Sequence, residues 1–228
     1  MPSAIMGSFI KAPSTLFLIF ANLATIIFAV YYQWSFITVL WIYWCQSVTI
    51  GFFNFFRILA LKDFSTEGFS VNGRQPKPTQ ATKISTAIFF AVHYGFFHFI
   101  YAIFLLAFTL TAAQSLAAEI DFIIGGAILF FITHLVSFLF YLNRQKPKEN
   151  IGKIMFYPYA RIIPMHLTLF LGGIFFGNAS IIVMVFFLLL KTAADVLMHF
   201  IEHKEQLNEI SYSTLAPGSA SESGINTE

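Results

Sequence analysis

The sequence predicts an all-α, polytopic transmembrane helix bundle of about six helices, with both the N- and C-termini in the cytoplasm. Of the 228 residues, 57% are hydrophobic and only 11% are charged, whereas a soluble domain carries about 25% charged residues. Apolar stretches of about 20 residues, long enough to span a hydrocarbon core, recur along the chain. Lys and Arg gather in alternate connections between these stretches, which is typical of membrane topology.

Six apolar stretches are long enough to cross a membrane as helices. Their predicted bounds are 15–33, 36–60, 84–112, 121–142, 154–176 and 180–202. No convincing small-residue cleavage site follows the first stretch, so we interpret it as a helix rather than as a signal peptide. The predicted organisation is a cytoplasmic segment over 1–14, the helix bundle over 15–204, and a disordered cytoplasmic tail over 205–228.

The basic residues of the connections set the predicted orientation. Lys11 precedes the first stretch, and Lys204 follows the sixth. The connections after the second and fourth stretches hold the other basic residues: Lys62, Arg74, Lys77, Lys83, Arg144, Lys146, Lys148 and Lys153. With six spans, all of these segments lie on one side, which must be the cytoplasmic side. The sequence therefore indicates a protein of the cell membrane, in contact with lipids. It contains no nucleic-acid motif.

Ionisable side chains within the predicted spans are the first candidates for function, because charge inside a bilayer is costly. In the sixth stretch, Lys191, Asp195, His199 and His203 recur every four residues, which places them along one helix face. Lys191 and Asp195 can also neutralise one another as a buried pair, and this purely structural interpretation stays open.

Histidines on other spans extend this set toward a metal site. The candidate ligands are His93 or His98, His166, Asp195 and His199. His93 and His98 are separated by about 140° around a helix, so we expect one of them at most to join a given site. Zn²⁺ or another divalent metal held by three such groups activates a water molecule, here for attack on a membrane-dissolved substrate.

Three other functions fit the same residues. His98 and His166 are candidate axial ligands of a haem. Lys191, Asp195 and His199 are candidates for a proton relay in a transporter. A structural or assembly role needs the polar groups only for helix packing. The sequence leaves open whether the chain is an enzyme and whether it forms homo- or hetero-oligomers within the membrane.

Polar residues of the second, fourth and fifth stretches have simpler interpretations. We expect His134 to donate one hydrogen bond to a neighbouring helix. Asn54 and Arg57 are three residues apart near the cytoplasmic end of the second stretch. We expect Arg57 and Arg161 to extend toward the membrane interface, as long basic side chains do.

Four segments resemble an uncharacterised prokaryotic family of multi-pass membrane proteins, classed only as a domain of unknown function. They are Tyr43-Trp44 through Arg57, His93-Tyr94-Gly95 with His98, Arg161 through His166-Leu167, and Lys191-Thr192 through Asp195 and His199. The resemblance covers most of residues 15–204. Gln46 departs from the family pattern, in which an acidic residue often follows the Tyr-Trp pair. The resemblance implies a fold and a set of residues, and it implies no reaction.

Overall fold

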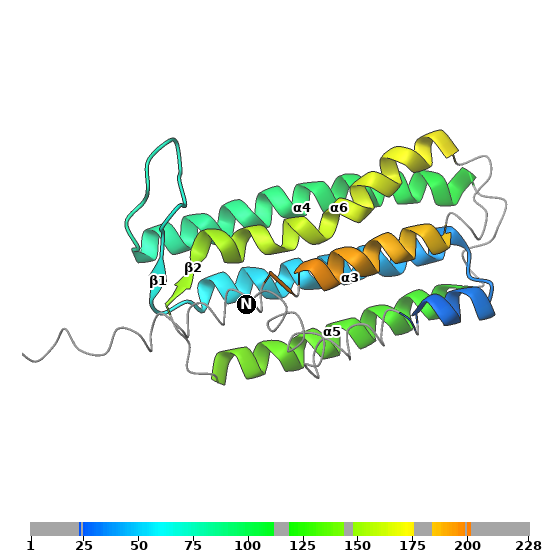
Figure 1. Ribbon diagram of the computed structural model, residues 1–228, viewed down its shortest axis with the longest axis horizontal. Helices are drawn as coiled ribbons and strands as arrows, with labels where there is room; N and C mark the ends of the chain where they lie inside the picture. The colour runs from blue at the N-terminus through cyan, green and yellow to red at the C-terminus, as the bar shows by residue number, and fades with distance from the viewer. Residues whose placement is uncertain are drawn as a thin grey trace, which may run out of the picture.

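The computed structural model describes residues 23, 25–111, 119–143, 148–175, 184–198 and 200–201. Within these ranges the chain is mostly helical (Figure 1). The labelled elements are α3 (Phe36–Leu59), β1 (Phe64–Ser65), α4 (Gln80–Thr111), α5 (Ile120–Asn143), β2 (Glu149–Asn150) and α6 (Ile151–Phe175). A further helical segment, 25–31, precedes α3, and another covers 184–198 after α6.

Helix α3 packs against α4, α5 and α6 (Figure 1). It begins at the N-cap residue Ser35, whose hydroxyl oxygen accepts a hydrogen bond from the Thr38 N–H at 3.2 Å. The carboxylate of Glu119 accepts hydrogen bonds from the Ser35 backbone N–H at 3.0 Å and from its hydroxyl at 3.1 Å. These bonds tie the residue that precedes α5 to the start of α3.

Gly51 lets α4 approach α3 closely. Tyr94 of α4 lies across this glycine, so that a Cβ at position 51 would be only 2.3 Å from the ring carbon Cε1. The Tyr94 hydroxyl donates to the Ser47 carbonyl at 2.9 Å, and Trp41 donates to the Thr109 hydroxyl at 3.0 Å. A residue early in α3 thus meets a residue late in α4, and residues near the middle of the two helices meet each other, so the two helices run antiparallel.

The strands β1 and β2 form a short parallel pair at one end of the bundle (Figure 1). Phe64 pairs with Glu149, and Ser65 pairs with Asn150. The Asn150 side chain also donates to the Glu67 carbonyl at 2.8 Å. Because β2 leads directly into α6, these contacts fix the connection between α3 and α4 against the start of α6.

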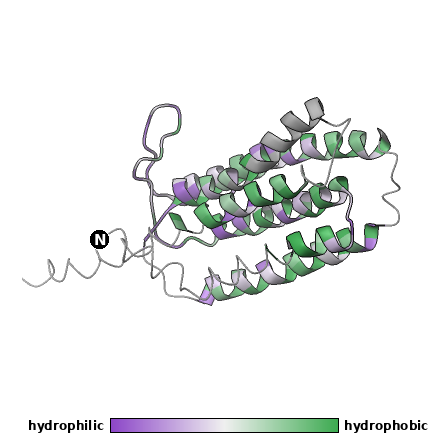
Figure 2. Cartoon of the chain, turned by 45° about the vertical axis from the view of Figure 1, so that its right-hand side comes forward, coloured by the Kyte–Doolittle hydropathy of each residue, from purple (hydrophilic) through white to green (hydrophobic). Residues whose placement is uncertain are grey.

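Large apolar side chains are exposed along the described helices. Figure 2 shows that hydrophobic residues are frequent throughout these helices. Helix α5 is the extreme case, because no residue is buried within its most apolar stretch of 18 residues. Within the described ranges, α3, α4 and α5 are each long and apolar enough to cross a membrane. Apolar surface on this scale is unfavourable in water and suits a lipid environment, so the fold indicates membrane association.

The predicted helical fold is confirmed, and three helices long and apolar enough to cross a membrane support the predicted membrane association. The helix bounds agree closely with the stretches predicted for α3 to α6. Helix α4 begins at Gln80 rather than at 84, because its polar first turn continues the helix. Lys83 in this turn is buried, and its ammonium donates to the Leu61 carbonyl at 2.8 Å. The segments 1–14 and 205–228 lie outside the described residues. The six spans and the orientation of the termini stay predictions.

Candidate functional site

A cavity of about 310 Å³ lies between α3, α5 and α6, toward the end of the bundle that carries β1 and β2. Its residues on α3 and on α5 recur in the same pattern of i, i+3, i+4 and i+7. This spacing places each set on one helix face. The lining residues are Ile50, Phe53, Asn54 and Arg57 on α3, His134, Ser137, Phe138 and Tyr141 on α5, and Tyr157 and Pro158 on α6.

The inner part of the cavity is mostly aromatic. Phe53 of α3 packs against Phe138 of α5, with ring centroids 5.6 Å apart, and its ring stacks on His134 at 6.4 Å. The Nδ1 of His134 lies 2.9 Å from the Phe130 carbonyl, one turn earlier on the same helix. Because a carbonyl only accepts, Nδ1 carries the proton of this bond. His134 thus bonds to its own helix and contacts α3 through its ring.

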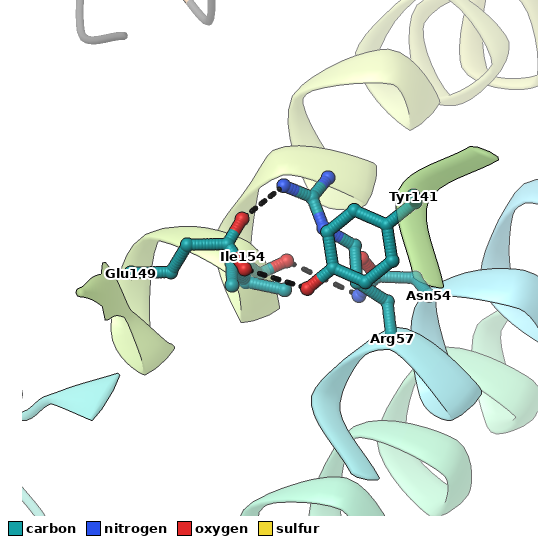
Figure 3. Close-up of polar contacts among 5 residues, drawn as sticks. All are labelled: Asn54, Arg57, Tyr141, Glu149 and Ile154. Atoms are coloured by element: carbon teal, nitrogen blue, oxygen red, sulfur yellow. Dashed lines mark hydrogen bonds and ion pairs between the residues drawn. The ribbon is translucent and has the colours of Figure 1, made fainter. Parts of the chain in front are cut away.

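At the opposite end of the cavity, a single carboxylate joins three elements (Figure 3). The Arg57 Nη2 donates to Glu149 Oε1 at 2.8 Å, and the Tyr141 hydroxyl donates to Glu149 Oε2 at 2.6 Å. The Arg57 guanidinium also lies over the Tyr141 ring, 4.7 Å from its centroid. Arg57, which we expected to extend toward the interface, instead bonds to β2 and leaves only 29% of its side chain exposed.

Asn54 satisfies a backbone group that Pro158 leaves without its usual donor. In a helix, the carbonyl of Ile154 accepts from the N–H of residue 158, and proline has no N–H. The Asn54 side chain donates to this carbonyl at 3.1 Å, and Asn54 is buried (Figure 3). A polar side chain of α3 is therefore fixed against α6 at the cavity wall.

The predicted metal ligands are elsewhere in the bundle. His93 is exposed, and its Nδ1 lies 2.9 Å from the Tyr159 hydroxyl. His98 is buried on α4, and His166 of α6 is exposed. Both have ring contacts with Tyr101, whose hydroxyl also bonds to His166. The structure thus brings together His98 and His166, and it places His93 on a different face of α4 from His98.

Asp195 is buried and pairs with Lys191 at 2.8 Å, as the structural interpretation of that pattern predicted. His199 lies outside the described residues. In the part of the chain that the structure describes, no three His, Cys, Asp or Glu side chains are grouped as metal ligands. The described residues therefore hold no complete metal site, and the metal site stays a prediction.

Several cavity residues were not singled out from the sequence. Ser137 and Tyr141 follow His134 by three and seven residues, a spacing that places all three on one helix face. This shared face could therefore have been predicted from the sequence. Glu149 lies in a connection outside the predicted spans, and only the packing of β2 brings it to Arg57.

Comparison with known proteins places the chain in a family without assigning it an activity. No curated protein and no solved structure matches it. A model of a family of unknown function, DUF6498, matches residues 5–210, which include all the labelled helices and every residue of the cavity. The chain therefore belongs to the DUF6498 family of unknown function.

Proposed function

We propose that this protein is a multi-pass protein of the cell membrane, with six spans and cytoplasmic termini, that binds a membrane-dissolved amphiphile. The cavity between α3, α5 and α6 is the observation that carries the proposal. Its volume of about 310 Å³ is at the lower end of small-molecule sites, which occupy roughly 300–1,000 Å³. A cavity of this size takes a polar head together with the first part of an attached chain.

Charge distribution supports a cytoplasmic position for the cavity. The polar end of the cavity is the end of the bundle at which the basic connections lie, with Lys62, Arg74, Lys77, Lys148 and Lys153. Glu119 and Asp121 lie at the other end, beside the start of α3. Under the positive-inside rule, the first of these ends faces the cytoplasm. The cavity then opens within the cytoplasmic leaflet.

The polarity of the cavity walls supports an amphiphile. Phe53 and Phe138 form an aromatic inner wall, whereas Arg57 and Tyr141 supply hydrogen-bond donors at the cytoplasmic end. A bound lipid-like molecule orients its apolar part inward and its head toward the donors. Ser137 is exposed on α5, a position that permits entry from the surrounding lipid.

The direct test is to fill the cavity and to measure which small molecules remain bound. The variant Ser137→Phe places a ring in the cavity, and Val136→Phe places the same ring on the adjacent exposed position outside it. We expect native mass spectrometry of the detergent-purified protein to detect an amphiphile on wild type and Val136→Phe, and to find it depleted on Ser137→Phe. Equal retention in the two variants, or no bound amphiphile on wild type, would reject the proposal.

A second candidate function, a divalent-metal or haem site, is favoured by one atom of His98. The Nδ1 of this buried histidine lies 2.9 Å from the Tyr94 carbonyl and must donate to it. Nε2 therefore carries a lone pair, and it is buried without a hydrogen-bond partner among the described residues. A complete ligand set would add His166 and residues that lie outside the described ranges, such as His199.

This second candidate is tested by elemental analysis and absorption spectroscopy of the purified protein. Stoichiometric metal, or a Soret band for haem, should be present in wild type and in His134→Gln and lost in His98→Gln. If neither signal appears in wild type, no metal or haem is bound and the candidate is rejected.

A further inference from the structure

We propose that the cavity binds a phosphoryl group, which displaces the Glu149 carboxylate from Arg57 and Tyr141. The proposal rests on the proposed function, because it assigns the chemical class of the head that occupies the same cavity. The polar end of the cavity offers more hydrogen-bond donors than the Glu149 carboxylate uses.

Three donors converge at this end, and the carboxylate satisfies two. Arg57 Nη2 donates to one Glu149 oxygen at 2.8 Å, and Tyr141 donates to the other at 2.6 Å. Arg57 Nε is buried and has no partner within the described ranges. Nε and Nη2 form one edge of the guanidinium, the edge that grips two oxygens of an anion side by side. Glu149 uses half of this edge.

A phosphoryl group fits the full donor set better than a carboxylate does. A phosphomonoester presents three terminal oxygens, so it can accept from Nε, Nη2 and the Tyr141 hydroxyl together. The Glu149 carboxylate, as it is placed, accepts from Nη2 and from the Tyr141 hydroxyl and leaves Nε unmet. Glu149 therefore acts as an internal competitor, whose negative charge must leave the guanidinium before the ligand binds.

Displacement of Glu149 has a structural consequence outside the cavity. Glu149 is half of β2, and it pairs with Phe64 of β1. Releasing its side chain removes the bonds that anchor this strand to α3 and α5. We therefore expect the β1–β2 pair to loosen when the phosphoryl group binds, so the connection between α3 and α4 reports on occupancy.

The experiment uses the full chain in phosphatidylcholine nanodiscs, titrated separately with phosphatidic acid and with inorganic phosphate. Glu149→Gln removes the competing charge but keeps a similar shape. Arg57→Lys keeps the positive charge but loses the two-donor edge. Arg74→Gln is the matched control, because it removes one exposed basic group at the same end of the bundle but outside the cavity. Thermal unfolding of each variant verifies that it folds.

We expect Glu149→Gln to tighten binding and Arg57→Lys to weaken it, each by about 10- to 100-fold, as for hydrogen bonds to charged groups. Arg74→Gln should change affinity by less than about threefold, as for an exposed charge. Hydrogen exchange at Phe64 and Ser65 should rise on binding in wild type and be high without ligand in Glu149→Gln.

The two titrations identify the source of the phosphoryl group. Binding of phosphatidic acid alone assigns a lipid head, whereas equal binding of inorganic phosphate assigns a soluble ester. Equal losses in Arg57→Lys and Arg74→Gln would overturn the proposal, since they would indicate attraction to surface charge. Absence of binding in both wild type and Glu149→Gln would also overturn it. The proposed function would survive either result if Ser137→Phe still depleted a bound amphiphile that lacks phosphorus.

Discussion

The bond from Asn54 to the Ile154 carbonyl predicts a measurable dependence on Pro158. In wild type, Asn54 is the side chain that supplies this buried carbonyl with a donor, because Pro158 has no N–H. Replacing Asn54 with Leu leaves the carbonyl unsatisfied. In a Pro158→Ala background, the N–H of residue 158 supplies the missing donor, and the same replacement should then be tolerated.

The expected magnitude follows from the cost of an unsatisfied group. A buried carbonyl that loses its partner costs about 1–3 kcal/mol. Interhelical hydrogen bonds measured in membrane proteins average about 0.6 kcal/mol and reach about 1.7 kcal/mol. We therefore expect Asn54→Leu to lower the free energy of unfolding by about 1–2 kcal/mol in wild type, and by less than about 0.5 kcal/mol in Pro158→Ala.

The assay is a double-mutant cycle on unfolding by sodium dodecyl sulfate in mixed micelles, followed by circular dichroism. Thr49→Val serves as the control, because the Thr49 hydroxyl bonds to the Cys45 carbonyl of its own helix at 2.9 Å. Its cost should be the same with Pro158 and with Ala at that position. An equal cost of Asn54→Leu in both backgrounds would refute the assignment of Asn54 as the donor that replaces the missing N–H.

Two further predictions concern helix packing. Gly51→Ala should destabilise the protein by about 1–3 kcal/mol, because its Cβ would be 2.3 Å from the Tyr94 ring. A Cβ at position 95 would meet no atom within 4 Å, so Gly95→Ala should be neutral or slightly stabilising in the same unfolding assay. If Gly51→Ala and Gly95→Ala lowered the free energy of unfolding equally, the close approach of Tyr94 to Gly51 would be contradicted. Lys191→Met should cost about 3–5 kcal/mol by removing the ammonium that pairs with the buried Asp195 carboxylate, whereas the double replacement with Asp195→Leu should recover most of that loss. No recovery would show that each side chain acts through other contacts.

The fold was largely predictable from the sequence because lipid imposes a simple requirement on a spanning segment. About 20 apolar residues in a row are sufficient to indicate a helix. The bounds of α3 and α5 were therefore close to the observed ones. Polar first turns gave no such signal, which is why α4 was predicted to begin too late.

The site was less predictable because depth in the membrane does not determine which helix face a residue occupies. His93, His98 and His166 were candidate ligands of one site. His98 and His166 both contact Tyr101, and His93 and His166 both contact Phe97. These shared aromatic neighbours do not amount to a group of three metal ligands among the described residues. Asn54 and Arg57 are three residues apart, which places them on one face of α3. Phe138 and Tyr141 of α5 have the same spacing, so a shared face could have been predicted for them as well. No pattern indicated Glu149, whose position depends on the pairing of β1 with β2.

The two ends of the cavity are held by different forces, and this difference indicates which end responds to a ligand. Aromatic packing of Phe53 against Phe138 holds the inner end, where a displaced ring would leave a void. At the outer end, Arg57 and Tyr141 are drawn toward Glu149 by hydrogen bonds that an anion can replace one for one. Exchange of partners there needs no repacking of the interior. The inner end of the cavity therefore keeps its packing when a ligand binds. The β1–β2 pair at the outer end is the part of the molecule that we expect to change when the cavity is occupied.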